Sequence, residues 1–203
     1  MLTSHISTIN EWRRTWKTKT KRLSITGCTS VEEVVKLAIH KAHSPSVLRA
    51  LDADGKSTKN AREEVARFLK DEILNALTKP FTFDEYDAWA GTVTKKIRAI
   101  YRNNHGFGDY TYGNAQKLFN MTIKYILSAD NIDPNLPIFE VAHIPVDRVI
   151  MNVAKKKLSI MPMTTAWSKT DNWESILSYQ RRLRAALPSN YPPMVWECEN
   201  WQQ

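Results

Sequence analysis

The sequence predicts an all-α protein, and three observations support this prediction. Helix-starting motifs occur at Ser30, Thr82 and Asp171, each followed three residues later by a glutamate. In such capping boxes the first side chain accepts from a helix amide, and the glutamate bonds back to the cap. Apolar residues recur at helical spacing, and no segment alternates regularly enough to predict a strand.

We expect seven helices, placed by these caps and by the apolar spacing. Their predicted ranges are 30–43, 60–78, 83–103, 114–128, 147–157, 171–186 and a short one at 193–202. Two loops stand out between them. Residues 103–113 ("NNHGFGDYTYG") hold three glycines, which permit tight turns, and residues 129–146 hold three prolines, which break any helix.

Length and composition are those of an ordinary globular protein. A chain of 203 residues with 42% hydrophobic residues can form one helical domain over 1–203, or two lobes with a cleft near 103–147. The apolar runs are too short to span a bilayer and the N-terminus lacks a signal-peptide core, so we expect a cytoplasmic protein. Two distant cysteines and one close histidine pair, His40 and His43, give no reason to expect a metal or cofactor.

The net charge of +8 is concentrated in four basic runs. They are "RRTWKTKTKR" at 13–22, "KKIRAIYR" at 95–102, "KKK" at 155–157 and "RRLR" at 181–184. Each run alone is typical of a solvated face, but four in one chain favour a surface that contacts phosphate. Nucleic acid is therefore the first candidate partner.

The segment "YGNAQKLFNMTIKY" (112–125) predicts an amphipathic helix. At 100° per residue its apolar side chains share one face, and Lys117, Asn120 and Lys124 fall on the opposite face. Such a polar stripe is usually solvated. Lys117, however, is expected in the first turn, where the positive end of the helix dipole disfavours a cation and so favours the nucleophilic, neutral amine.

Asp147 ends the turn "HIPVD" (143–147) and directly precedes a predicted helix. It is well placed as an N-cap that accepts from the amide of Val149 or Ile150. Capping alone would explain this residue. A capping carboxylate is also held rigidly and stays ionised, so a catalytic role is compatible with the structural one.

The order of these features resembles the helix-hairpin-helix DNA glycosylase superfamily. The resemblance is carried by a glycine-bearing turn between two helices, a lysine at the start of the second helix, and Pro-Val-Asp before another helix. Within the superfamily, "AQKLFNMTIKYI" followed by "HIPVDRVIMNVA" is most similar to the archaeal 8-oxoguanine DNA glycosylase family. The resemblance covers residues 95–157, under a third of the chain. One departure is that "HGFG" lies further upstream of the lysine than the compact Gly-x-Gly of the superfamily, with "YTYG" intervening.

The resemblance implies a two-lobed helical fold and a base-excising enzyme with AP-lyase activity. Lys117 would be the nucleophile and Asp147 its carboxylate partner. The DNA-contacting residues that it implies, together with the adjacent basic run, are Gly106, Gly108, Gly113, Asn114, Gln116, Lys124, Lys95, Lys96 and Arg98. Candidates for a pocket around a flipped base are His143, Trp167, Tyr179 and Gln180, with core packing the alternative for each aromatic.

The expected partner is double-stranded DNA with a flipped, modified base, bound by a monomer associated with the nucleoid. The resemblance implies 8-oxoguanine, but the residues leave the base open, including the hypermodified bases of viral DNA, and leave repair and anti-phage defence both open. Two other classes also remain. One is a non-catalytic helical nucleic-acid-binding protein in which Lys117 only adds charge. The other is a protein-interaction module, such as a phage or bacterial defence factor, whose basic surface meets an acidic protein.

Overall fold

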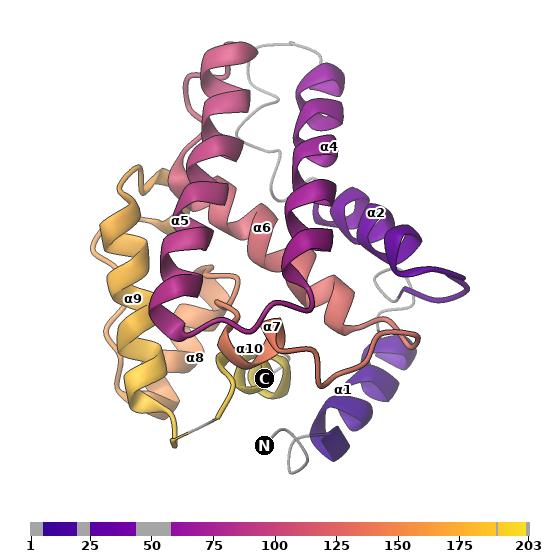
Figure 1. Cartoon of the computed structure of the whole chain (residues 1–203). Helices are drawn as coiled ribbons and strands as arrows, with labels where there is room; N and C mark the ends of the chain where they lie inside the picture. Colours follow the sequence, from indigo (N-terminus) through magenta and orange to yellow (C-terminus); the bar gives the residue numbers. More distant parts are fainter. Residues whose placement is uncertain (1–5, 20–24, 44–57, 190, 202–203) are drawn as a thin grey trace.

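All regular secondary structure that the structure describes is helical (Figure 1). The structure is a computed structural model, and it describes residues 6–19, 25–43, 58–189 and 191–201. Its elements are α1 (Ile6–Lys19), α2 (Val31–Ala42), α4 (Lys59–Ala76), α5 (Phe83–Ala99), η3 (Ile100–Asn104), α6 (Tyr112–Leu127), α7 (Ile138–Val141), α8 (Arg148–Leu158), η4 (Trp167–Lys169), α9 (Trp173–Ala186) and α10 (Pro193–Asn200). The all-α prediction is confirmed over these ranges. No helix within them is both long and apolar enough to cross a bilayer.

Helix α6 passes through the middle of the molecule and is buried on nearly all sides (Figure 1). Helices α2, α5 and α9 pack against it, and of its residues only Tyr112 and Met121 are partly exposed. The apolar face was predicted correctly. The opposite face was expected to be solvated, and this expectation is wrong, because Lys117, Asn120 and Lys124 are also buried.

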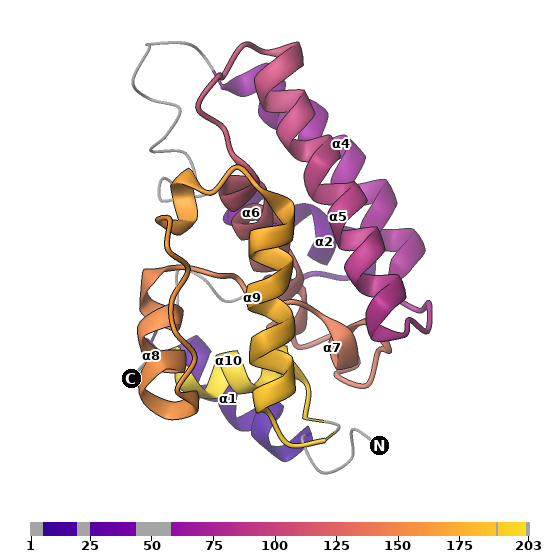
Figure 2. The same ribbon diagram turned by 90° about the vertical axis from the view of Figure 1, so that its left-hand side faces the viewer.

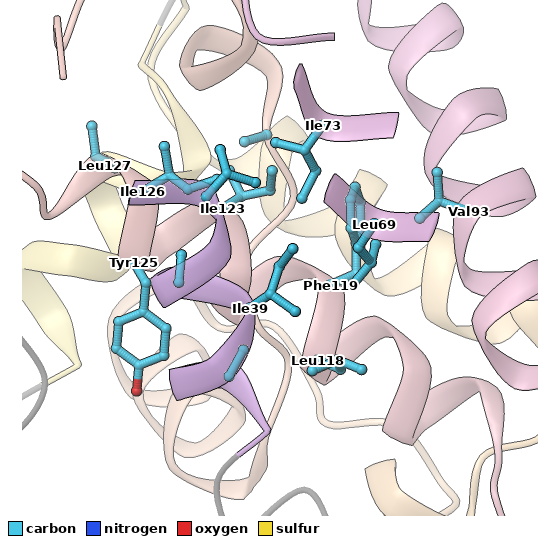
Figure 3. Close-up of a cluster of buried hydrophobic side chains, with 14 of the residues drawn as sticks. Ile39, Leu69, Ile73, Val93, Leu118, Phe119, Ile123, Tyr125, Ile126 and Leu127 are labelled. Carbon is cyan, nitrogen blue, oxygen red and sulfur yellow. The ribbon is translucent and has the colours of Figure 1, made fainter. Parts of the chain in front are cut away.

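The apolar side chains form two clusters. The larger one unites α2, α4, α5 and α6, and Figure 3 shows Ile39, Leu69 and Val93 meeting Phe119 and Ile123 of α6. Each fully buried side chain of this kind stabilises the fold by about 1.5–3 kcal/mol. The smaller cluster is built from α8, α9 and the loop before α8, and α10 contributes to both clusters. Figure 2 shows α8 and α9 on one side of the molecule and α4 and α5 on the other.

Two of the three predicted capping motifs start helices as expected. Ser30 caps α2, and Thr82 with Glu85 forms a complete capping box on α5. The prediction for Asp171 is wrong: Asn172 caps α9 by accepting from the amide of Ser175 at 3.1 Å. Asp171 is instead engaged by basic side chains of α5 and η3, as described below.

The start of α6 also differs from the prediction. The helix begins at Tyr112, because Thr111 and Asn114 form a reciprocal capping box, which was not predicted. Lys117 therefore lies in the second turn. The helix dipole acts mainly within the first turn, so it does little to favour the neutral amine of Lys117. Helices α1 and α7 were not predicted at all.

Candidate active site

Lys117 of α6 and Asp147 at the start of α8 form an ion pair, although they lie thirty residues apart in the sequence. Nζ of Lys117 is 2.6 Å from Oδ2 of Asp147, slightly shorter than is usual for a charge-assisted hydrogen bond. The two side chains are 9% and 17% exposed, so the pair is shielded but not sealed from solvent. The two predicted catalytic residues are thus brought together.

Asp147 is also the N-cap of α8, as predicted. Its Oδ1 accepts from the amide of Ile150 at 2.9 Å, while Oδ2 accepts from Lys117. The helix therefore fixes the orientation of the carboxylate, and one oxygen remains directed at the lysine.

Three side-chain amides hold the buried segment 144–146 that leads to Asp147. Gln116 donates to the carbonyl of Val146 at 2.8 Å and accepts from its amide at 3.1 Å. Gln180 donates to the carbonyl of Ile144 at 2.8 Å and accepts from its amide at 3.2 Å, and Asn120 donates to the same carbonyl at 3.0 Å. These bonds satisfy backbone groups that would otherwise be buried without partners. Gln116, expected at the DNA, and Gln180, expected in a base pocket, act here as braces of the loop.

A second ion pair, between Lys124 and Glu197, lies fully buried between α6 and α10. Nζ of Lys124 is 2.9 Å from Oε1 and 2.7 Å from Oε2 of Glu197, and both side chains are 0% exposed. The ammonium also lies 4.5 Å from the ring centroid of Trp201. The expectation that Lys124 contacts DNA is wrong, because its side chain is fully buried.

The N-terminus of α6 is covered by the segment around η4. The amide of Gly113 donates to the carbonyl of Thr170 at 2.9 Å, and a Cβ at Gly113 would lie 1.7 Å from the carbonyl oxygen of Trp167. Asn114 is buried as the capping partner of Thr111. Gly113 and Asn114, which were expected to contact DNA, therefore form hydrogen bonds with Thr170 and Thr111 of the same chain. The segment that contains Trp167 covers the start of α6.

Arg98 is held by Asp171. Its Nε donates to Oδ1 of that carboxylate at 2.6 Å, and Arg102 donates to Oδ2 at 2.7 Å. The hydrogen bonds from Arg98 hold the pKa of Asp171 below its usual range, although burial acts in the opposite direction. A phosphate that bound Arg98, as expected from the sequence, would have to compete with the carboxylate of Asp171 for its guanidinium group.

Four of the expected DNA-contacting residues do lie at the surface. Lys95 and Lys96 are exposed on α5, and Gly106 and Gly108 are exposed in the loop before α6. Gly106 has a φ of 73°, in the left-handed region that glycine adopts most easily.

His143 is buried in a charge network rather than in an open pocket. Its Nε2 lies 2.7 Å from Oδ1 of Asp87, which also accepts from Arg181 and Arg184. Burial acts to raise the pKa of Asp87, but the hydrogen bonds from His143 and the arginines hold it well below its usual range. Burial lowers the pKa of His143.

Tyr179 is a base-pocket candidate whose pKa is affected by the charge of Asp147. It is fully buried and its hydroxyl has no hydrogen-bond partner. Burial raises its pKa to about 12, Arg182 opposes this shift, and the charge of Asp147 adds to it.

Glu197 and Asp87 were not predicted, because no motif or spacing in the sequence singles them out. Asn120 was visible only as part of the polar stripe. Within the described ranges, no group of three or more His, Cys, Asp or Glu side chains could hold a metal ion.

Comparisons of the chain with protein-family models, with curated proteins and with solved structures found no match.

Proposed function

We propose that this protein is a DNA glycosylase with AP-lyase activity, in which Lys117 is the nucleophile and Asp147 its carboxylate partner. The observation that carries the proposal is the 2.6 Å contact between these two side chains. A lysine beside a group that can accept its proton is the arrangement that an amine nucleophile needs, because only the neutral amine attacks.

The reaction begins when Lys117 passes one proton to Asp147 or to the departing base. The neutral Nζ attacks C1′ of the damaged nucleotide, the bond from C1′ to the base breaks, and the base leaves with the electron pair and takes up a proton. The nitrogen, after losing a proton, expels the ring oxygen O4′, which is protonated, and a protonated Schiff base results. Loss of a proton from C2′ then expels the 3′-phosphate with the electrons of the C3′–O bond.

Asp147 passes any proton that it has accepted from Lys117 to the departing base, and the carboxylate, ionised again, stabilises the positive charge that develops on the sugar. A carboxylate does this best when its position is fixed before the reaction, because no reorganisation is then needed. The hydrogen bond from the Ile150 amide and the braces on residues 144–146 supply this fixation.

The surface and the core support the same proposal. Exposed cations lie on α5 (Lys95 and Lys96), at the start of α8 beside Asp147 (Arg148), and further along α8 (Lys155 and Lys156). Cations of this kind bind the phosphates of duplex DNA. Lys117 belongs to the helix at the centre of the larger apolar cluster, and Asp147 to the segment that builds the smaller one. Two such clusters would suit a two-lobed enzyme with its site at their junction.

The substrate is a modified base in duplex DNA, bound by one copy of the chain. The resemblance of residues 95–157 favours 8-oxoguanine, and the hypermodified bases of viral DNA form the second group to be tested. Repair and defence are both served by the same chemistry.

A non-catalytic nucleic-acid-binding protein is the second candidate. It is favoured by the fact that both oxygens of Asp147 are already occupied, one by a helix amide and one by Lys117, as in a structural ion pair.

Borohydride trapping separates these candidates. The protein is incubated with duplexes that contain 8-oxoguanine, an abasic site or a hypermodified base, and sodium borohydride reduces any Schiff base to a stable adduct. Wild type is expected to give an adduct that Lys117→Gln abolishes, while Lys79→Gln, which removes an exposed lysine that follows α4, retains it. Salt-dependent DNA binding without an adduct on any of these duplexes would favour the non-catalytic candidate.

A further inference from the structure

Helix α8 has one exposed face, which is rich in cations, and the helix contains no acidic residue. The helix lies at the edge of the molecule in Figure 2. At 100° per residue, five exposed side chains fall within an arc of about 120°. They are Arg148, Val149, Asn152, Lys155 and Lys156. A surface of this composition attracts a polyanion such as DNA.

Val149 is the apolar member of this face. It is 46% exposed and belongs to neither of the two apolar clusters. The stability of α8 gives no reason for a valine at this position, because alanine is the better helix former and would expose less apolar surface to water. A contact with a partner would explain the residue.

Three other large apolar side chains are exposed among the described residues, and their surroundings differ from those of Val149. Val31 and Phe83 are each followed directly by two acidic residues, which repel DNA. Met161 lies beyond the far end of α8, away from Asp147 in the sequence. Of these four side chains, only Val149 combines cationic neighbours with a place beside the candidate active site.

The covalent chain keeps Val149 within reach of that site. Consecutive Cα atoms are about 3.8 Å apart, so the Cα of Val149 lies within about 7.6 Å of the Cα of Asp147. The carboxylate of Asp147 is 2.6 Å from Nζ of Lys117. Neighbouring base pairs of a duplex are stacked about 3.4 Å apart. The distance from Asp147 to Val149 therefore corresponds to about two base steps.

We propose that Val149 enters the base stack of duplex DNA and fills the space that the extruded nucleotide leaves, while the cations of α8 bind the flanking phosphates. An apolar side chain suits this space, because the faces of the flanking bases would otherwise be exposed to water. This inference rests on the proposed function, since it takes the Lys117 site to receive an extruded nucleotide. It adds the residue that replaces the nucleotide and the helix along which the DNA lies.

The test compares an intact duplex with the same duplex carrying a tetrahydrofuran abasic analogue. The analogue leaves a vacant place in the base stack and cannot form a Schiff base, so it reports binding alone. Fluorescence anisotropy at one fixed salt concentration gives the Kd of each protein for both duplexes. The proteins are wild type, Val149→Ala, Val31→Ala and Arg148→Gln, and circular dichroism confirms that each is folded.

Wild type is expected to prefer the abasic duplex. Val149→Ala should weaken binding to the abasic duplex by about tenfold, because it removes two carbon atoms from an apolar contact, and should leave binding to the intact duplex unchanged. Val31→Ala removes the same atoms from a 42% exposed valine at the start of α2 and should change neither Kd. Arg148→Gln should weaken binding to both duplexes by a similar factor, because a phosphate contact does not depend on the base.

The proposal is overturned if wild type shows no preference for the abasic duplex, if Val149→Ala keeps the full preference, or if Val31→Ala loses it equally. Borohydride trapping on natural abasic sites distinguishes this failure from failure of the proposed function. A wild type that forms no adduct, but whose preference depends on Val149, would remove the enzymatic function and retain the insertion. An adduct through Lys117 with a preference that does not depend on Val149 would do the reverse.

Discussion

Nζ of Lys117 lies 2.6 Å from Oδ2 of Asp147, while the other oxygen of that carboxylate accepts from the amide of Ile150 at 2.9 Å. One residue thus serves both as a helix cap and as the partner of a shielded lysine. The two tasks need different chemistry, since an amide can cap a helix but cannot carry the charge. Substitutions at Asp147 can therefore separate structure from activity.

Asp147→Asn should retain the cap and lose the reaction. Asparagine caps as well as aspartate does, so the free energy of unfolding should fall by about 3 kcal/mol, from the shielded lysine left without its carboxylate and not from the cap. The trapping rate should fall on the order of 100-fold, because the fixed charge is gone. Asp147→Ala, which also removes the cap, should cost about 1 kcal/mol more in urea unfolding. Wild-type trapping in Asp147→Asn would show that the carboxylate has no catalytic task.

Gly113→Ala should destabilise the protein by about 3 kcal/mol, at the upper end of the cost of overpacking. The added Cβ would lie 1.7 Å from the carbonyl oxygen of Trp167, which is backbone and cannot rotate away. Gly108→Ala is the matched control, since a Cβ there meets nothing within 4 Å. Chemical denaturation of both variants checks this, and equal stabilities would mean that the segment at η4 does not pack against α6 as described.

Gln116→Ala should weaken both the fold and the site. It leaves the amide and carbonyl of Val146 buried without partners, which costs about 2–3 kcal/mol, and it loosens the segment that positions Asp147. We expect a lower free energy of unfolding together with a reduced trapping rate per folded molecule. Asn135→Ala, which removes an exposed amide that donates to nearby Asp133, serves as the control and should change neither quantity. A stable variant with full trapping would contradict the role of Gln116 as a brace.

Acidification should destabilise the protein through His43. Burial lowers the pKa of His43 to about 4, and its Nδ1 donates to the carbonyl of Ile39 at 2.9 Å. An unfolded chain binds the proton near pH 6.5 and the folded one only near pH 4, so stability falls as the pH drops through this window. The loss between pH 7.5 and pH 5 should be about 2 kcal/mol.

His43→Gln should reduce that loss, because glutamine does not titrate. Urea unfolding of both proteins at pH 7.5 and pH 5 gives the comparison, and groups such as His143 and Glu197 cancel because both proteins contain them. An identical loss in the two proteins would argue against a buried, neutral His43.

The sequence predicted the parts of the fold that depend on local chemistry. The caps at Ser30, Thr82 and Asp147, and the apolar face of α6, follow from side-chain spacing alone. That Lys117 and Asp147 form one site was implied by the resemblance of residues 95–157, since spacing alone explains Lys117 as part of a polar stripe and Asp147 as a helix cap. Two helices, α1 and α7, were not predicted.

Burial of polar groups could not be predicted in this way. Lys124 looked like a solvated lysine because its partner, Glu197, lies 73 residues further along the chain. Asp171 was predicted to be a helix cap, but its carboxylate forms ion pairs with Arg98 and Arg102. Such pairings are decided by tertiary packing, which brings together side chains that no sequence motif links.

The most direct test of the central claim is to identify the residue that carries the trapped DNA. After borohydride reduction, nuclease and protease digestion, tandem mass spectrometry locates the residual sugar on a peptide. The proposal predicts that the modified residue is Lys117, with an unmodified Lys124 on the same helix. An adduct on the N-terminal amine or on an exposed lysine such as Lys95, or no adduct with any modified duplex, would contradict it.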